Sequence, residues 1–226
     1  MKPSSVIFDI ETLGLPLETF DEVQQEYLFK FADTEEKREE EIQKFALHAV
    51  TGRIIAVAML NPESMSGKVF YQAATPEQSR SADGKIEFIA GDEALLLRNF
   101  WDSVQRYDQI VTFNGRTFDC PFLLLRSAML GISPTRNLVP YRYSTEKHCD
   151  LLDQLTFYGA TRRFNLDFYC KAFGIKSPKS EGITGLDLGP LYNAGKFRQI
   201  AEYCMGDVIA TAELYKRWSE YLDLKE

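Results

Sequence analysis

Two acidic residues near the start of the chain have the spacing of a pair that binds one cation. Asp9 and Glu11 interrupt the apolar run from Val6 to Ile10 and stand two positions apart. Side chains two positions apart lie on the same face of a β-strand, with α-carbons about 7 Å from each other. Carboxylate oxygens at that separation can converge on a small hard ion such as Mg²⁺ or Mn²⁺. Taken alone, however, such a pair is more often a solvated strand end.

A tyrosine and an aspartate near the other end of the chain share one face of a predicted helix. Tyr203 and Asp207 are four residues apart in a segment whose apolar residues recur at helical spacing. Residues four apart are neighbours on a helix surface. Taken alone, these two residues are an ordinary part of an amphipathic helix.

A third acid, Asp119, follows a predicted strand and turn. The run from Ile110 to Phe113 is β-prone, and Asn114-Gly115 after it is a strong turn signal. A helix is predicted to begin near Thr117, which places Asp119 in its first turn. A carboxylate there is stabilised by the helix dipole, so the position alone also suits a capping acid.

Together these residues resemble the DEDD superfamily of 3′-to-5′ exonucleases, and within it the proofreading exonuclease domain of family B DNA polymerases. The likeness is strongest to predicted stand-alone exonucleases related to that domain, and it spans nearly the whole chain. Three ordered blocks carry it: Phe8-Asp9-Ile10-Glu11-Thr12, Asn114-Gly115-Arg116-Thr117-Phe118-Asp119-Cys120-Pro121-Phe122-Leu123 and Tyr203-Cys204-Met205-Gly206-Asp207.

The third block is similar to the tyrosine (DEDDy) branch of the superfamily. The other branch has histidine five residues before the last aspartate, and here that residue is Glu202, followed by Tyr203. The two histidines of the sequence, His48 and His148, lie outside this block. His148 and Asp150, at the predicted end of the last strand, are weaker candidates for contact with a substrate.

The resemblance implies hydrolysis by two divalent metal ions, Mg²⁺ or Mn²⁺. It implies that Asp9 bridges both ions and that Glu11 and Asp207 complete the site of the first ion. Asp119 would hold the second ion mainly through water. Tyr203 would orient the attacking water by a hydrogen bond, because a phenol with a reference pKa of about 10 is a poor base at neutral pH.

Four residues beside these acids are candidate substrate contacts. Thr12 and Leu13 follow the first acidic pair directly and are placed to touch the terminal nucleotide. Asn114 and Phe118 belong to the middle block. A phenylalanine in the position of Phe118 more often packs in the core than contacts a substrate.

The net charge of −7 is unevenly distributed along the chain. Residues 112–180 carry a net charge of +5, whereas residues 1–111 carry −9 and residues 181–226 carry −3. Phosphate binding normally requires a basic surface, and aromatic faces stack on unpaired bases. We therefore expect the middle segment to form a nucleic-acid-binding wall. Its basic residues are Arg116, Arg126, Arg136, Arg142, Lys147, Arg162, Arg163, Lys171, Lys176 and Lys179, and its aromatic residues include Tyr141, Tyr143, Phe157, Tyr158, Phe164 and Tyr169.

The alternation of predicted strands and helices indicates an α/β fold. The resemblance adds a ribonuclease-H-like fold, with a mixed five-stranded sheet that is flanked by helices and has its second strand antiparallel to the rest. Besides the segments described above, strands are predicted at 5–10, 53–60, 68–72 and 85–89, and helices at 93–105, 117–130, 164–173 and 196–220.

An insertion is predicted between the first two strands, at about residues 17–47. Phe20, Val23, Tyr27 and Phe31 follow helical spacing, and the charged run 35–41 is typical of an exposed helix. We expect a helical hairpin near the active cleft. A plain insertion is a simpler interpretation than a lid or substrate guide.

Length and composition predict one soluble domain, residues 1–226. The chain is 45% hydrophobic and long enough to bury a large core. It contains no apolar run of membrane length and no signal segment, so a cytoplasmic protein is expected. The four cysteines form no Cys-x-x-Cys pair, which disfavours structural zinc and a disulfide scaffold, and they are predicted to be buried or reduced thiols.

The sequence therefore predicts a metal-dependent 3′-5′ exonuclease that releases nucleoside monophosphates from single-stranded DNA. An RNA 3′-5′ exonuclease is the main alternative, since the catalytic acids do not distinguish the sugars. A nucleic-acid-binding module without activity would usually have lost one ligand, and Asp9, Glu11, Asp119, Tyr203 and Asp207 are all present. An exonuclease that acts only with a polymerase or helicase partner in replication or repair is a further alternative.

Overall fold

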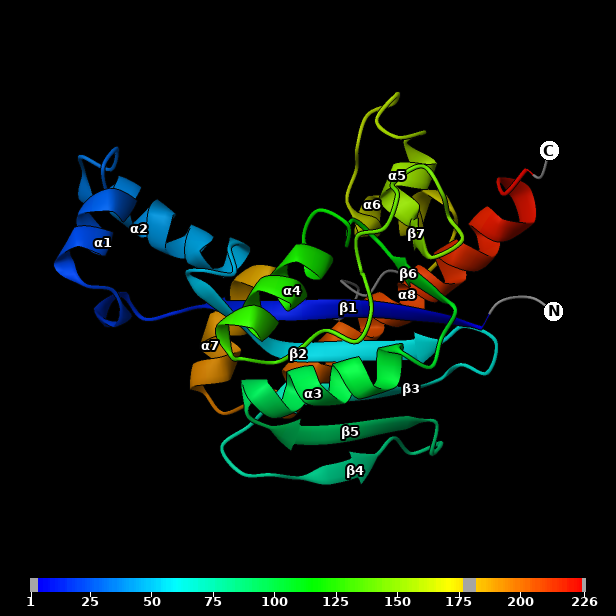
Figure 1. Cartoon of the computed structure of the whole chain (residues 1–226), viewed down its shortest axis with the longest axis horizontal. Helices are drawn as coiled ribbons and strands as arrows, with labels where there is room; N and C mark the ends of the chain where they lie inside the picture. Colours follow the sequence, from blue (N-terminus) through cyan, green and yellow to red (C-terminus); the bar gives the residue numbers. More distant parts are fainter. Residues whose placement is uncertain (1–3, 177–181, 225–226) are drawn as a thin grey trace.

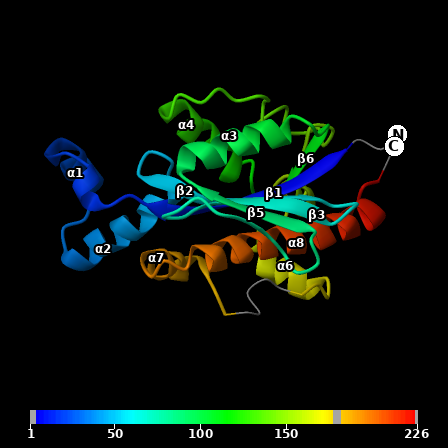
Figure 2. The ribbon, with the colours of Figure 1, turned by 90° about the horizontal axis from the view of Figure 1, so that it is seen from below.

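The computed structural model describes residues 4–176 and 182–224. Its centre is a mixed sheet with the strand order β4-β5-β3-β2-β1-β6-β7, which has helices on both faces (Figures 1 and 2). The strands are β1 (Ser5–Gly14), β2 (Gly52–Asn61), β3 (Ser66–Gln72), β4 (Gln78–Arg80), β5 (Ile86–Gly91), β6 (Gln109–Thr112) and β7 (His148–Asp150). The α-helices are α1 (Glu22–Leu28), α2 (Glu35–Lys44), α3 (Glu93–Val104), α4 (Asp119–Met129), α5 (Leu151–Leu155), α6 (Leu166–Ala172), α7 (Leu188–Asn193) and α8 (Phe197–Tyr221).

Five neighbouring strands have the predicted arrangement. In the order β3-β2-β1-β6-β7, β1 is parallel to β6 and β6 to β7, whereas β2 is antiparallel to both β1 and β3. The prediction of five strands in total was wrong, because β5 pairs parallel with β3 and β4 pairs antiparallel with β5. The short β4 has the polar sequence Gln78-Ser79-Arg80, which shows no apolar alternation. Such an edge strand leaves no hydrophobic signal in the sequence.

The alternation of side chains along β1 builds two cores, one on each face of the sheet. Phe8 and Ile10 pack with α3 and α4, whereas Ile7 packs with residues of α8 on the opposite face. Figure 2 shows α3 and α4 on one side of the sheet and α6, α7 and α8 on the other. Asp9 and Glu11 stand two and four positions after Ile7 on the strand, so their side chains lie on the same face as Ile7, toward α8.

The predicted helices form, and capping groups fix some of their boundaries. Asp92 accepts a hydrogen bond from Leu95 N at 2.7 Å and begins α3, and Asn165 does the same for α6 through Phe168 N. Both residues are of the types preferred at N-caps. The cap at Asn165 shortens the predicted 164–173 helix to Leu166–Ala172. The predicted 117–130 helix is also shorter, at Asp119–Met129, although its N-cap residue, Phe118, makes no side-chain capping hydrogen bond.

The insertion between β1 and β2 is helical, as predicted. It contains α1 and α2, preceded by a 3-10 turn at Leu17–Thr19 and followed by another at Phe45–Leu47. In both views it projects beyond one end of the sheet (Figures 1 and 2). Phe20 is buried against Phe45, but the other members of the predicted apolar stripe, Val23, Tyr27 and Phe31, are exposed.

The four cysteines lie in the interior of the protein. Cys120, Cys149, Cys170 and Cys204 are free and buried. Within residues 4–176 and 182–224, none of the helices combines the length and the apolar character needed to cross a bilayer.

Candidate active site

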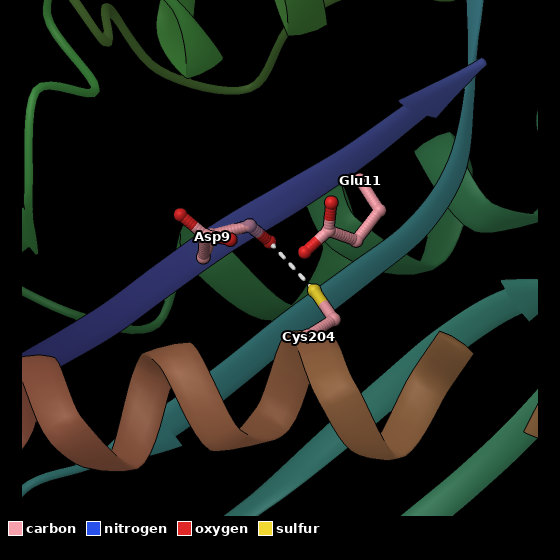
Figure 3. A group of neighbouring side chains, drawn as sticks. All are labelled: Asp9, Glu11 and Cys204. Carbon is pink, nitrogen blue, oxygen red and sulfur yellow. Dashed lines mark hydrogen bonds between the residues drawn. The ribbon is translucent and has the colours of Figure 1, made fainter. Parts of the chain in front are cut away.

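The first acidic pair lies in the middle of the sheet, on β1. Asp9 and Glu11 extend toward α8, from which Cys204 reaches back toward the strand (Figure 3). Each of the three offers a possible ligand atom, and these atoms all lie within 4.8 Å of one another. The Cys204 thiol also donates a hydrogen bond to the Asp9 carbonyl oxygen at 3.5 Å. The period of two in the strand has thus brought both carboxylates to one place.

Asp119 approaches β1 from α4, at a stretch of β1 that lies beyond its pairing with β6. β6 pairs with β1 only along Ser5 to Ile7 and ends at Thr112. Beyond that point the chain turns away into α4, and the edge of β1 is free to accept another partner. Asp119 Oδ1 accepts a hydrogen bond from Ile10 N at 3.0 Å. A side chain at the start of α4 therefore takes the place of a missing strand.

Asn114 and Gly115 form the turn before α4 that the sequence predicted. Asn114 has a φ of 65°, a left-handed conformation that asparagine tolerates better than most residues. A Cβ atom added to Gly115 would lie 2.5 Å from Thr112 Cβ, so only glycine fits there without a shift. These two residues make the sharp change of direction that places Asp119 beside β1.

The last pair comes from α8. Tyr203 and Asp207 both line a cleft of about 460 Å³ whose walls also include Asp9 and Asn114. Burial and the charge of Asp207 raise the pKa of Tyr203, and a hydrogen bond between the two side chains adds to the shift. The helical spacing of four therefore places the phenol beside the carboxylate, as predicted.

A second hollow, of about 1150 Å³, lies at the other end of the sheet. Its lining includes Ser5, Gln109 and Tyr215. The hydroxyls of Ser5 and Tyr215 both donate to Gln109 Oε1, at 2.8 and 2.9 Å. Of the four candidate acids, Asp9 and Asp207 line the smaller cleft and none lines the larger hollow, so the smaller cleft is the better candidate for chemistry.

The acids of the cleft strongly disfavour one another's charge. Burial raises the pKa of Asp9 well above its usual value, and the carboxylates of Asp119, Asp207 and Glu11 raise it further. Burial also raises the pKa of Glu11, followed by the charges of Asp207 and Asp119. Burial raises the pKa of Asp119 to about 7, although the hydrogen bond from Ile10 N opposes the shift. A divalent cation would relieve this repulsion.

Burial and the same acids keep the neighbouring phenol and thiol protonated. Burial raises the pKa of Tyr203, and the charges of Asp207, Glu11 and Asp9 raise it further. Burial, followed by Glu11 and Asp9, raises the pKa of Cys204 well above its usual value. A neutral thiol is a weak metal ligand, since the thiolate is the form that binds. The donors that suit a cation here are therefore carboxylate oxygens.

The four candidate substrate contacts have different surroundings. Asn114 lines the cleft and accepts a hydrogen bond from the Thr117 hydroxyl at 2.7 Å. Phe118 packs on the α4 side of the core, with its ring centroid 5.6 Å from that of Phe122. The buried Thr12 hydroxyl donates to Ala46 O at 2.6 Å and so holds the end of the insertion.

Leu13, the fourth candidate, is partly buried against the core on the face of the sheet that also carries α7 and α8. Neither Thr12 nor Leu13 belongs to the lining of the cleft, as far as the described residues define it, and the same holds for the residues of the insertion. Of the four candidates, Asn114 has the clearest access to the cleft.

Asp150 has a positioning role that its sequence context did not reveal. Its Oδ1 and Oδ2 accept hydrogen bonds from Asn114 N at 2.9 Å and from Arg116 N at 2.8 Å. Oδ1 also caps α5 by accepting from Leu152 N at 3.0 Å. The buried Asp150 carboxylate thus fixes the turn that precedes Asp119. Asp150 therefore acts on the site indirectly, by holding the backbone that leads to Asp119.

His148 is also buried and is held by hydrogen bonds on both ring nitrogens. Nδ1 lies 2.9 Å from Leu138 O, and Nε2 lies 2.8 Å from Thr112 Oγ1. A carbonyl oxygen can only accept, so Nδ1 carries the proton and Nε2 accepts from the threonine hydroxyl. Burial lowers the pKa of His148 to about 3, and the charge of Arg116 contributes. This neutral, enclosed ring is disfavoured as a substrate contact.

The low pKa of His148 predicts a loss of stability in acid. An unfolded histidine titrates near pH 6.5. Between about pH 6.5 and 3 the unfolded chain therefore binds a proton that the folded protein excludes. The contribution of His148 is fully present above pH 6.5 and falls by up to about 1.4 kcal/mol for each pH unit below it.

Guanidinium unfolding at pH 7.5, 5.5 and 4.5 measures this effect. The His148→Asn variant cannot titrate and keeps a donor near the position of Nδ1. We expect it to be less stable than the wild type at pH 7.5, with a difference that narrows toward pH 4.5. A difference that stays constant with pH would show that His148 is not the group responsible.

The predicted basic wall is only partly available to a ligand. Arg126 is buried in an ion pair with Glu93, with Nη2 and Oε2 2.7 Å apart. Arg136 donates from Nη1 to Tyr107 O at 2.7 Å and so caps the segment after α3. These two guanidinium groups stabilise the fold, which corrects their assignment to a binding surface. Lys179 lies outside the described residues.

The remaining aromatic and basic residues of that segment divide into two groups. Phe164 stacks on Phe168 with a centroid distance of 4.3 Å, and Tyr169 packs edge-on against Phe113. Lys171 pairs with Asp167 along α6. By contrast, Arg142 and Arg163 both approach Asp153, and Arg163 lines the cleft, as Phe164 does.

The chain matches a known protein family over residues 43–223. The family is described as "Predicted 3'-5' exonuclease related to the exonuclease domain of PolB". The chain is also 25% identical, over 232 residues, to the catalytic subunit of DNA polymerase epsilon from Schizosaccharomyces pombe. That similarity covers 96% of this chain but only 9% of the polymerase.

A solved structure has the same fold. The family B DNA polymerase from the hyperthermophilic archaeon Pyrobaculum calidifontis matches with a TM-score of 0.63 and 20% sequence identity. The match covers 97% of this chain and 25% of that one. The ribonuclease-H-like fold implied by the resemblance is therefore confirmed. The chain spans only a small part of the length of either relative.

Proposed function

Because the chain belongs to the family of predicted 3′-5′ exonucleases related to the exonuclease domain of PolB, we propose that it removes nucleotides from the 3′ end of single-stranded DNA. The products would be nucleoside monophosphates. One observation carries the proposal: Asp9, Asp207 and Tyr203 line one cleft, with Glu11 and Asp119 directly beside it. Segments nearly two hundred residues apart in the sequence thus supply one set of acids.

The residues of the cleft fit hard divalent cations. Asp9, Glu11, Asp119 and Asp207 would hold them, because carboxylate oxygens are the ligands that Mg²⁺ and Mn²⁺ prefer. When bound, two such ions activate a water molecule and stabilise the charge that develops on the leaving oxygen. The raised pKa values of Asp9 and Glu11 support this assignment, since burial and the neighbouring carboxylates all act in the same direction on them.

Tyr203 would position the attacking water. Its raised pKa keeps the phenol protonated at neutral pH, so Tyr203 cannot act as a base there. It can both donate and accept a hydrogen bond. With Asp207 as one partner, the phenol can hold the water in line with the phosphorus of the terminal phosphodiester. Correct alignment of reacting atoms is the contribution expected of such a group.

The Tyr203→Phe variant tests this role. We expect kcat to fall about a hundredfold, because the hydrogen bond to water is lost, while KM changes little. Tyr221→Phe, near the exposed end of the same helix, is the matched control and should behave like the wild type. An equal loss in kcat and in substrate affinity would assign Tyr203 to binding instead.

The substrate class and the metal are tested in a single assay. Single-stranded DNA, duplex DNA and RNA, each labelled at the 5′ end, are incubated with Mg²⁺, Mn²⁺ or EDTA. We expect stepwise shortening of single-stranded DNA with either metal and none with EDTA. Faster shortening of RNA than of DNA would instead support the RNA exonuclease, since only RNA offers a 2′-hydroxyl for recognition.

A further inference from the structure

Three tyrosines, two of them exposed, form a cluster of contacting rings. The ring centroids of Tyr141 and Tyr143 are 5.7 Å apart, and those of Tyr143 and Tyr158 are 4.9 Å apart. Tyr141 is 73% exposed and Tyr143 is 62% exposed. We call these three residues the tyrosine cluster. Rings that are this exposed contribute little to the core, and their faces remain open to a ligand.

The backbone beneath the cluster is in a conformation that aromatic residues rarely adopt. Phe157 and Tyr158 have φ values of 49° and 58°, in the left-handed region, and Gly159 follows with 94°. Left-handed geometry is unusual for a bulky side chain and tends to occur at functional sites. Here it ends α5, leaves Phe157 63% exposed and places the ring of Tyr158 against Tyr143. In this turn Tyr158 N donates a hydrogen bond to Asp153 O at 2.7 Å.

Three arginines surround Asp153 next to this cluster. Arg142 Nη2 lies 2.5 Å from Asp153 Oδ1, and Arg163 Nη2 lies 3.6 Å from the same oxygen. Arg116 Nε lies 3.9 Å from Asp153 Oδ2. We call the three the arginine cluster. Even when Asp150, whose carboxylate is hydrogen-bonded by backbone amides, is counted with Asp153, positive charge is in excess.

Arg116 has donor capacity that the described protein atoms do not use. Its side chain is only 9% exposed, and Nη1 donates to Pro140 O at 2.7 Å. Nε and Nη2 are buried, and among the described residues neither has a hydrogen-bond partner. Buried donors without acceptors are unfavourable and need an explanation. Because these two atoms are enclosed, Arg116 adds positive charge to the arginine cluster, and Arg142 and Arg163 are its accessible members.

The two clusters are continuous with the candidate active site. Arg163, which is 47% exposed, belongs both to the arginine cluster and to the wall of the cleft that contains Asp9 and Tyr203. Arg142 is the residue between Tyr141 and Tyr143 in the sequence, so stacking and charge alternate along one short segment. Alternating aromatic and basic side chains are typical of surfaces that bind single-stranded nucleic acid.

We propose that the tyrosine and arginine clusters bind the single-stranded DNA that trails behind the 3′ end held in the cleft. The bases stack on Tyr141 and Tyr143, and the phosphates pair with Arg142 and Arg163. This inference rests on the proposed function, because the 3′ end is taken to lie at the acids. It predicts that the unpaired strand, and not only its terminal nucleotide, is recognised.

Binding measured without hydrolysis tests the inference. Fluorescence anisotropy of a 5′-fluorescein-labelled 12-nucleotide oligothymidylate is recorded in EDTA with the full chain. We expect Tyr141→Ala and Tyr143→Ala each to weaken binding about tenfold, the usual loss for one stacked base. Tyr27→Ala, an exposed tyrosine of the insertion, is the matched control and should bind like the wild type.

The salt dependence separates stacking from phosphate contact. Each phosphate contact to a single strand contributes about 0.7 to the slope of log K against log salt concentration. Arg142→Ala should reduce that slope by about this amount, whereas Tyr143→Ala should leave it unchanged. Arg106→Ala, an exposed arginine after α3, serves as the control for charge. Melting curves establish that each variant is folded.

The outcomes distinguish this inference from the proposed function. Wild-type affinity in the Tyr143 variant and an unchanged salt slope in the Arg142 variant would overturn the inference, even if the enzyme shortens DNA. The two clusters would then be candidates for binding a protein partner. Tenfold losses with the expected slopes would support it, even if Mg²⁺ and Mn²⁺ elicit no hydrolysis. Failure of the wild type to bind the oligonucleotide would also overturn it.

Discussion

Replacement of Asp9 by asparagine should abolish the hydrolysis of single-stranded DNA and at the same time stabilise the metal-free protein. Asp9 is in electrostatic contact with all the other acids of the site, and its pKa is raised by Asp119, Asp207 and Glu11 in addition to burial. In the proposed two-metal site, its loss would remove a ligand for both cations. We expect activity to fall about a thousandfold or more, which corresponds to ~4 kcal/mol of transition-state stabilisation.

The gain in stability follows from the sign of the pKa shift. The folded-state pKa of Asp9 lies above its unfolded value, so ionisation costs stability as pH rises through the folded value. In EDTA at pH 8, Asp9→Asn should therefore melt a few degrees higher than the wild type, whereas Asp102→Asn, at an exposed site on α3, should not. A variant that melts lower, or that retains activity, would contradict the assignment.

Replacement of Arg126 by methionine should cause the largest loss of stability. Arg126 donates to both oxygens of Glu93, at 2.8 and 2.7 Å, and Glu93 Oε1 also accepts from Ile54 N at 2.8 Å. This buried pair links α4, α3 and β2. Without Arg126 the Glu93 carboxylate stays buried and unpaired, at a cost of about 3–5 kcal/mol. The melting temperature should fall by about 10 °C.

A double variant separates the unpaired charge from lost packing. Methionine keeps much of the apolar stem of arginine, and Glu93→Gln keeps an acceptor for Ile54 N. Glu93→Gln/Arg126→Met should therefore recover most of the lost stability, because no uncompensated charge remains. Arg106→Met, at an exposed arginine, is the control. If the double variant is as unstable as the single one, packing and not charge determines the effect.

The sequence predicted the elements that carry the acids because periodicity is a local property. A period of two placed Asp9 and Glu11 on one face of β1, and a period of four placed Tyr203 beside Asp207 on α8. The Asn114-Gly115 signal correctly located the turn before α4. Each of these predictions depends on residues a few positions apart.

Contacts between distant segments could not be predicted in this way. The hydrogen bond from Ile10 N to Asp119 exists because β6 ends early, which no pattern around either residue reveals. Arg126 appeared to belong to a basic surface, and only its approach to Glu93 shows that it is buried. Similarly, the apolar spacing of Val23 and Tyr27 predicted a helix correctly but not the exposure of their side chains.

Polarity of degradation is the property that distinguishes the proposed enzyme from other nucleases. A linear single-stranded DNA labelled at its 5′ end and a covalently closed circle of the same sequence are incubated together with the protein and Mn²⁺. We predict that the linear strand is shortened one nucleotide at a time from its 3′ end and that the circle, which has no end, persists. Cleavage of the circle, or release of the 5′ label as the first product, would contradict a 3′-5′ exonuclease.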